Sequence, residues 1–252
     1  MKLKDWIAFM EGVAPPELAL DWDNVGLLVS PEREELSRVL VALDCTPEVA
    51  REAAASASEL DLCHHPLYFK PVRRMLYDAP ETAAACLLVR HGVGHYAAHT
   101  NLDAALGGVN DVLAGLFGVR GEPFGEGLGR IGALPEPETL ASLAKRASAL
   151  LGAQVACVGE ADRPIRRAAF LGGACGDELR AAKAAGAELL ITGELKHNAA
   201  LDARFLGLCC IVAGHHETER IILKPLIERL QAAADDVQYI LAQSDTAPFA
   251  AV

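Results

Sequence analysis

The sequence lacks the long apolar runs that would make it a membrane protein. No stretch reaches the ~18 consecutive apolar residues that a spanning helix needs, although 52% of the 252 residues are hydrophobic. The opening segment, Met1–Trp6, has no signal-peptide core. We therefore expect a globular, cytoplasmic protein without a membrane partner.

Paired cysteine motifs and excess positive charge are also missing. The seven cysteines are an odd number, and none has C-x-x-C spacing, so the sequence suggests neither a disulfide framework nor a zinc finger. The formal net charge of −11 argues against a general nucleic-acid surface, because such surfaces are basic. Local basic pockets stay compatible with this charge, so a small anionic substrate remains open.

Buried-strand and helix patterns alternate along the chain, which is typical of α/β folds. Arg38–Asp44 is predicted to be a strand, Pro47–Ser58 a helix with Thr46 as N-cap, and Leu60–Cys63 a second strand. A strand–helix–strand unit places its two strands parallel in one sheet. The same order of elements returns from Ala168 onward, so we predict two similar α/β domains with mixed, largely parallel sheets covered by helices.

A glycine-rich segment is the best candidate for a domain boundary. Gly118–Gly132 contains six glycines, which predicts a first domain over 1–125 and a second over 126–252. Near the end, Glu217–Leu230 is predicted to be one helix despite Pro225. The sequence leaves open whether this helix packs back on the first domain.

Histidines follow several of the predicted strands, where ligands bind in open α/β sheets. His64 and His65 end an apolar run, and Pro66 keeps them out of the strand interior. Adjacent residues of a regular strand point in opposite directions, so the pair binds two different ions, or one ion if the backbone bends. Five of the eight histidines lie just after strand ends: His64, His65, His99, His215 and His216.

Carboxylates with suitable spacing accompany these histidines. His215 and Glu219 stand four residues apart, so on a helix they share one face. Taken with Asp103, His64 and His65, they form a set of three histidines and two carboxylates, which suits two divalent ions. The alternative for His215 and Glu219 alone is a solvated surface pair.

Six motifs resemble, in their order, those of the Nif-three-like family. Its members are dinuclear-metal proteins often labelled GTP cyclohydrolase type 2 homologues, and the resemblance covers nearly the whole chain. The motifs are Trp22–Leu27, Cys63–Lys70, Ala98–Asp103, Gly107–Asp111, Thr192–Lys196 and Gly214–Glu219.

The resemblance implies a toroidal homohexamer with two metal ions per chain, in the cleft between the domains. It makes Asp103 the bridging carboxylate, and His99 a nearby group that supports the ligands or transfers a proton, with a merely packed histidine as the alternative. The ligands that it implies are His64, His65, Asp103, His215 and Glu219.

The chain departs from the family pattern at two motifs. Cys63 stands where the family usually has Ser or Thr, so oxidation could perturb the site. His197-Asn198 stands where Tyr-His is common, which puts any role of that histidine in doubt. The additional domain that longer members insert between the two halves is absent.

The leading functional hypothesis is a metal-dependent hydrolase that attacks a nucleotide or phosphoester through a metal-bridging hydroxide. The metal could be Zn, Mn, Fe, Co or Ni, since mixed histidine and carboxylate ligands accept all of them. The basic residues that could hold phosphates, assigned by their proximity in sequence, are Lys70, Arg73, Arg74 and Lys196. Two alternatives remain: a non-catalytic scaffold or metal-delivery protein, and a metal that only holds the two halves together.

Overall fold

The computed structural model describes residues 1–175 and 178–249, which fall into two compact units. The first unit consists of Met1–Ala105 and Leu223–Pro248, and the second mainly of Leu106–Ile222. Leu106–Ile222 is therefore inserted between the two segments of the first unit. In the described part of the chain, no helix is long and apolar enough to cross a bilayer.

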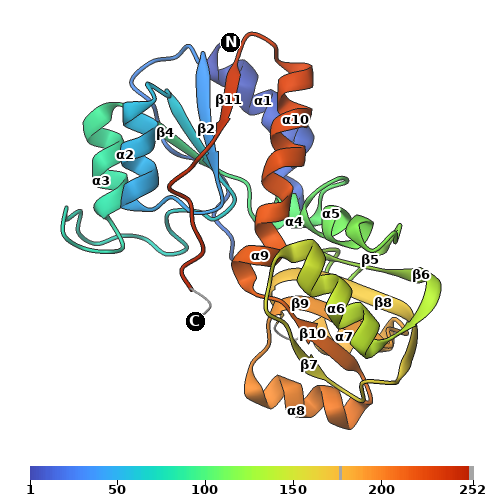
Figure 1. Cartoon of the computed structure of the whole chain (residues 1–252). Coiled ribbons are helices and arrows are strands. Elements are labelled where there is room, and N and C mark those ends of the chain that lie inside the picture. Colours follow the sequence, from blue (N-terminus) through green and yellow to red (C-terminus); the bar gives the residue numbers. More distant parts are fainter. Residues whose placement is uncertain (176–177, 250–252) are drawn as a thin grey trace. The chain divides into compact units, whose positions relative to one another are not determined.

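The first unit is built on a five-stranded mixed sheet with the order β1-β4-β3-β2-β11. β1 is antiparallel to β4, and the other neighbours are parallel. Helices α2 and α3 lie on one face of the sheet, and α1 and α10 on the other (Figure 1). The elements are α1 (Leu3–Val13), η1 (Pro16–Leu18), β1 (Gly26–Val29), β2 (Arg38–Ala42), α2 (Pro47–Ala55), β3 (Leu60–Cys63), α3 (Ala83–His91), β4 (Gly94–Ala97), α4 (Thr100–Ala104), α10 (Leu223–Ala233) and β11 (Gln238–Leu241).

The predicted strand–helix–strand unit at β2, α2 and β3 is confirmed, with the two strands parallel. The Thr46 side chain caps α2 by accepting a hydrogen bond from the Val49 amide at 3.2 Å, and Pro47 occupies the first helical position. All four residues of β3 are buried, as expected for a strand covered on both faces. This unit delivers the chain to His64 at the carboxyl end of the sheet.

The second unit is built on a six-stranded mixed sheet with the order β5-β6-β8-β9-β10-β7. Its central strands β8, β9 and β10 are parallel, and the flanking pairs are antiparallel. Helices α5 and α6 bury their apolar residues in a common core with one face of this sheet. The elements are α5 (Val109–Leu116), β5 (Glu122–Phe124), β6 (Gly129–Thr139), α6 (Leu140–Leu151), β7 (Ala156–Val158), β8 (Pro164–Ala174), α7 (Glu178–Ala184), β9 (Leu189–Glu194), α8 (His197–Leu206), β10 (Cys209–Val212), α9 (His215–Glu219) and η2 (Arg220–Ile222).

The boundary between the units differs from the one predicted at 125/126. That position lies inside the β5–β6 hairpin, whose strands pair Phe124 with Gly129. The glycines of this segment serve the hairpin turn, since Gly125 and Gly127 have φ of +54° and +87°, which glycine adopts readily. The crossings lie at 105/106 and 222/223 instead, so α10 belongs to the first unit.

Candidate metal centre

Two adjacent histidines leave the buried end of β3. The His64 Nδ1–H donates to the Ala98 carbonyl at 2.8 Å, because a carbonyl oxygen can only accept. His65 Nδ1 lies 2.8 Å from an Asp44 carboxylate oxygen, which likewise accepts. In the neutral rings the lone pair is thus at Nε2, and an imidazole fixed in this way by an acceptor is typical of metal ligands.

His99 joins this pair from the N-terminal end of α4. The His99 ring centroid lies 5.1 Å from that of His64 and 5.5 Å from that of His65. One nitrogen from each of the three rings falls within 4.8 Å of the others. Because β3 ends at Cys63, the chain bends, and the adjacent His64 and His65 rings converge rather than diverge.

Asp103 adds a carboxylate to the three imidazoles. It lies on α4, whose N-cap is His99, so one short helix positions both side chains. An Asp103 Oδ1 atom lies 3.7 Å from His64 Nε2, and its side chain is 14% exposed. The first unit therefore gathers four of the residues that the sequence singled out: His64, His65, His99 and Asp103.

Asp23, which the sequence analysis did not select as a site residue, holds His99 in place. One carboxylate oxygen accepts from His99 Nδ1 at 2.9 Å, and the other accepts from the Thr100 amide at 3.0 Å and from the Thr100 hydroxyl. Burial raises the pKa of Asp23, but the hydrogen bonds from His99 and Thr100 outweigh it and lower the pKa to about 2. Asp23 is therefore an ionised acceptor at neutral pH.

The Asp23→Asn variant tests this arrangement through its pH dependence. A carboxyl whose pKa is lowered on folding stabilises the protein above its unfolded pKa, and this contribution is lost as the pH falls toward 2. Urea unfolding of the metal-free variant at pH 7 should show a loss of about 1–3 kcal/mol, typical for hydrogen bonds to a charged group. The deficit should shrink between pH 4 and pH 2. A deficit that is independent of pH over this range would contradict an ionised Asp23.

Two exposed aromatic side chains stand beside His99. The Trp22 and Phe69 rings lie 6.0 Å and 5.5 Å from the His99 ring and 5.9 Å from each other. Asn24 fixes the Phe69 loop by donating from its side chain to the Tyr68 carbonyl at 2.6 Å. This surface offers π-faces on which a planar group can stack.

The predicted basic residues fall into separate places. In the first unit, Lys70, Arg73 and Arg74 line a pocket of about 570 Å³ together with Phe69. In the second unit, Lys196 lines a smaller hollow of about 180 Å³. Phe69 also contacts the His99 ring. The pocket lined by Lys70, Arg73 and Arg74 therefore lies beside a predicted site residue.

The second unit supplies a further imidazole and carboxylates. His215 Nε2 lies 3.1 Å from Glu219 Oε2, which confirms that the two side chains share a helix face. His215 Nδ1 lies 3.2 Å from Glu194, at the end of β9. Glu219 is 3% exposed, unlike an ordinary solvated surface carboxylate. Glu194 was part of a sequence motif, but its position beside His215 could be found only from the fold.

Two glycines lie next to His215 and Glu219. Gly214, the N-cap of α9, has φ +91°. Gly173, at φ +62°, lies so close that a Cβ atom there would be 2.1 Å from Glu219 Oε1 and 3.3 Å from His215 Nε2. The Thr218 hydroxyl fixes this approach by accepting from the Gly173 amide at 3.1 Å and donating to the Gly214 carbonyl at 2.8 Å.

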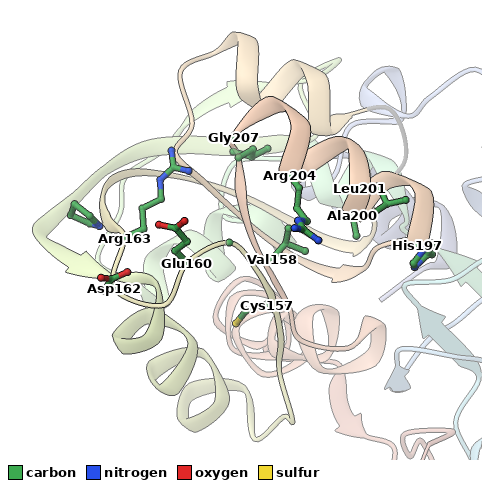
Figure 2. Close-up of a pocket in the computed structure, with 13 residues that line it drawn as sticks. Cys157, Val158, Glu160, Asp162, Arg163, His197, Ala200, Leu201, Arg204 and Gly207 are labelled. Carbon is green, nitrogen blue, oxygen red and sulfur yellow. The ribbon is translucent and has the colours of Figure 1, made fainter.

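A larger pocket of the second unit contains none of the predicted ligands. Its volume is about 940 Å³, and it lies between α8 and the segment from Cys157 to Pro164. Figure 2 shows His197 at one end of it and Arg163 toward the other. His197, which stands where the family motif commonly has tyrosine, is one of the residues that line this pocket.

The donor atoms suit divalent metal ions. The first unit presents a cluster of three imidazoles, with the Asp103 carboxylate 3.7 Å from one of them, and the second presents an imidazole beside a nearly buried carboxylate. Such mixed nitrogen and oxygen sets bind Zn, Mn, Fe, Co and Ni. The acceptors behind the rings supply the outer contacts that metal-ligating histidines ordinarily make.

The sequence model of the Duf34/NIF3 family, described as NGG1p interacting factor 3, matches residues 1–248. The chain belongs to the Duf34/NIF3 family. A relative from Clostridium perfringens named "GTP cyclohydrolase 1 type 2 homolog" is 32% identical over 259 residues, covering 99% of each chain. A Schizosaccharomyces pombe relative named "Protein NIF3 homolog" is 33% identical, covering 86% of this chain and 84% of that protein.

A solved structure shares this fold over the whole chain. The crystal structure of a Staphylococcus aureus hypothetical protein superposes with a TM-score of 0.91 at 27% identity, covering 100% of this chain and 99% of that one. The predicted α/β class with two mixed, helix-covered sheets is thus confirmed for this Duf34/NIF3 protein.

Proposed function

We propose that this Duf34/NIF3 protein is a dinuclear-metal-dependent hydrolase. Its ligands would be His64, His65, Asp103, His215 and Glu219, with Asp103 as the bridging carboxylate. The observation that supports this most strongly is the engagement of Nδ1 by an oxygen acceptor in His64 and His65, which leaves Nε2 as the donor atom of each.

Two divalent ions, when bound, supply Lewis acidity and make water nucleophilic near neutral pH. His99 would take up or deliver a proton at Nε2, because Asp23 holds its Nδ1. Two divalent ions would carry more positive charge than two carboxylate ligands neutralise, so the site would favour an anionic substrate.

The substrate class that the site favours is a nucleotide or another phosphoester. Lys70, Arg73 and Arg74 would bind the phosphate from the pocket that they share with Phe69, and Lys196 would contribute from the second unit. Trp22 and Phe69 would stack on a base, a contact worth about 1–3 kcal/mol. The names of the relatives, as GTP cyclohydrolase type 2 homologues, agree with a nucleotide but belong to those proteins.

The assembly that we propose is a toroidal homohexamer, as the family resemblance implies. Exposed apolar side chains of the second unit support a contact between copies. Phe205 and Leu201 are 91% and 51% exposed and lie four residues apart on α8, so they share one face.

Metal analysis of His64→Ala and Glu219→Ala beside the wild type tests the hydrolase. We expect about two ions per wild-type chain at this centre, a loss of at least one of them in each variant, and a parallel loss of hydrolysis of one substrate in a panel of nucleotides and phosphoesters. The matched controls are His91→Ala and Glu228→Ala, which remove an exposed histidine and an exposed glutamate. Both controls should keep metal and activity.

Two results would contradict this proposal in different ways. Two ions without turnover of any substrate would favour a metal-binding scaffold or delivery protein with the same ligands. No stoichiometric metal in the wild type, even after reconstitution, would eliminate the site itself.

A further inference from the structure

A second cluster of ligand-type side chains lies inside the first unit and is not part of the proposed hydrolase centre. Asp61 and His95 face each other in register across the parallel strands β3 and β4. Cys63 follows Asp61 by two residues, so it lies on the same face of β3. Cys45 enters from the loop between β2 and α2. One ligand atom from each of the four residues lies within 4.8 Å of the others.

These groups are buried between the sheet and α2 and α3. Asp61 and His95 are 0% exposed and Cys63 is 1% exposed, whereas Cys45 is partly accessible. Cys63 and Cys45 contact the apolar core that α2 and α3 form with this face. Polar groups in such a place cost free energy unless a partner compensates them, so the cluster requires an explanation.

The hydrogen bonds within the cluster leave one donor atom of His95 available. Asp61 Oδ2 lies 3.0 Å from His95 Nδ1, and the Cys63 thiol lies 3.3 Å from the same carboxylate oxygen. His95 Nε2 is buried and has no nitrogen or oxygen partner within the described part of the chain, and the Cys45 thiol interacts with the same ring. Metal-binding histidines ordinarily have this arrangement, in which one ring nitrogen bonds to a carboxylate and the other ligates the metal.

We propose that Cys45, Asp61, Cys63 and His95 form a separate structural site for one Zn²⁺ ion. Two thiols, an imidazole and a carboxylate are a complete tetrahedral donor set for zinc. Bonds of about 2.0–2.3 Å place the ligand atoms of a tetrahedral ion about 3.3–3.8 Å apart. The present separations of up to 4.8 Å therefore need to shrink by about 1 Å, which side-chain rotation provides.

This zinc site would be chemically distinct from the hydrolase centre. It contains two sulfur ligands, and the hydrolase ligands include none, so thiolate ligation reports on it alone. It would tie the β2–α2 loop to β3 and β4 immediately before His64. The ion would thus stabilise the part of the first unit from which the histidine pair extends.

The test is titration of the reduced, metal-free full-length protein with Co²⁺, followed by absorption spectroscopy. We expect a thiolate-to-cobalt charge-transfer band that accounts for one ion per chain, in addition to the two ions of the hydrolase centre, and that is lost in Cys45→Ser and Cys63→Ser. Cys210→Ser is the matched control, since Cys210 is a buried cysteine of the second unit. It should keep the band, as should a His64→Ala, Glu219→Ala double variant.

The zinc-loaded double variant provides a second readout. X-ray absorption should show a sulfur shell at about 2.3 Å, absent from its Cys45→Ser derivative. Cys45 is the most accessible member, so its replacement by serine is the substitution least able to disturb folding. Absence of the band in the folded wild type, its persistence in both cysteine variants, or a Cys45–Cys63 disulfide that resists reduction and excludes cobalt would each overturn the zinc site. Failure of the hydrolase would leave these results unchanged.

Discussion

Replacing Trp6 by alanine should lower the free energy of unfolding by about 3–5 kcal/mol, the range for deleting a large buried aromatic side chain. Trp6 is fully buried on the face of the first sheet that α1 covers. Its Nε1–H donates to the Tyr239 hydroxyl at 3.0 Å, and its ring packs edge-on against Tyr96 at 5.2 Å. The variant thus loses apolar burial and leaves a cavity between α1, β4 and β11. Urea unfolding monitored by circular dichroism measures the loss.

The second tryptophan of the chain provides the control. Trp22 is 57% exposed, so Trp22→Ala should change the free energy of unfolding by less than about 1 kcal/mol. Equal effects of the two substitutions would show that the packing of α1 on the first sheet is not as described.

Replacing Gly173 by alanine should weaken metal binding by about 10–100-fold, as is typical when groups that orient metal ligands are changed. The new Cβ atom would occupy the space of the Glu219 carboxylate, at 2.1 Å from Oε1. The carboxylate must therefore turn away from His215, and the pair loses its common orientation. Calorimetric titration of the metal-free protein with Mn²⁺, which binds thiolates poorly, measures the change in affinity.

Gly186→Ala is the control that separates the displacement of Glu219 from the conformational strain of alanine at a positive φ. Gly186 also has a positive φ, of +88°, but a Cβ atom there would meet nothing within 4 Å. Both variants pay the conformational cost of about 1–2 kcal/mol, and only Gly173→Ala should lose affinity. Equal metal affinity in the two variants would contradict a role of Gly173 in placing Glu219.

Local patterns predicted most of the fold. The helix at Pro47 was set by its cap and its proline, and the strands by their apolar runs, all of which act between neighbouring residues. The single helix predicted over Glu217–Leu230 is wrong, because it is divided into α9, η2 and α10. Pro225 lies in the first turn of α10, where its missing N–H is not needed, so a break before it costs little.

Features that depend on distant contacts were not predictable in this way. The strand β11 was missed, since it is held in the sheet by β2, about 200 residues earlier in the chain. Spacing alone placed His215 and Glu219 on one helix face. It did not predict that Asp23 holds His99 or that Gly173 lies against Glu219. Cys45 and His95 had no local signal at all, because the register between β3 and β4 brings His95 to Asp61.

The insertion of the second unit into the first has a consequence for synthesis on the ribosome. Leu106–Ile222 forms one uninterrupted segment, so this unit can fold as soon as it has emerged. The first unit lacks α10 and β11 until the chain has been synthesised as far as Leu241, and β2 meanwhile presents an unpaired edge. The first unit is therefore completed after the second, and a truncation that removes β11 would expose an edge prone to aggregation.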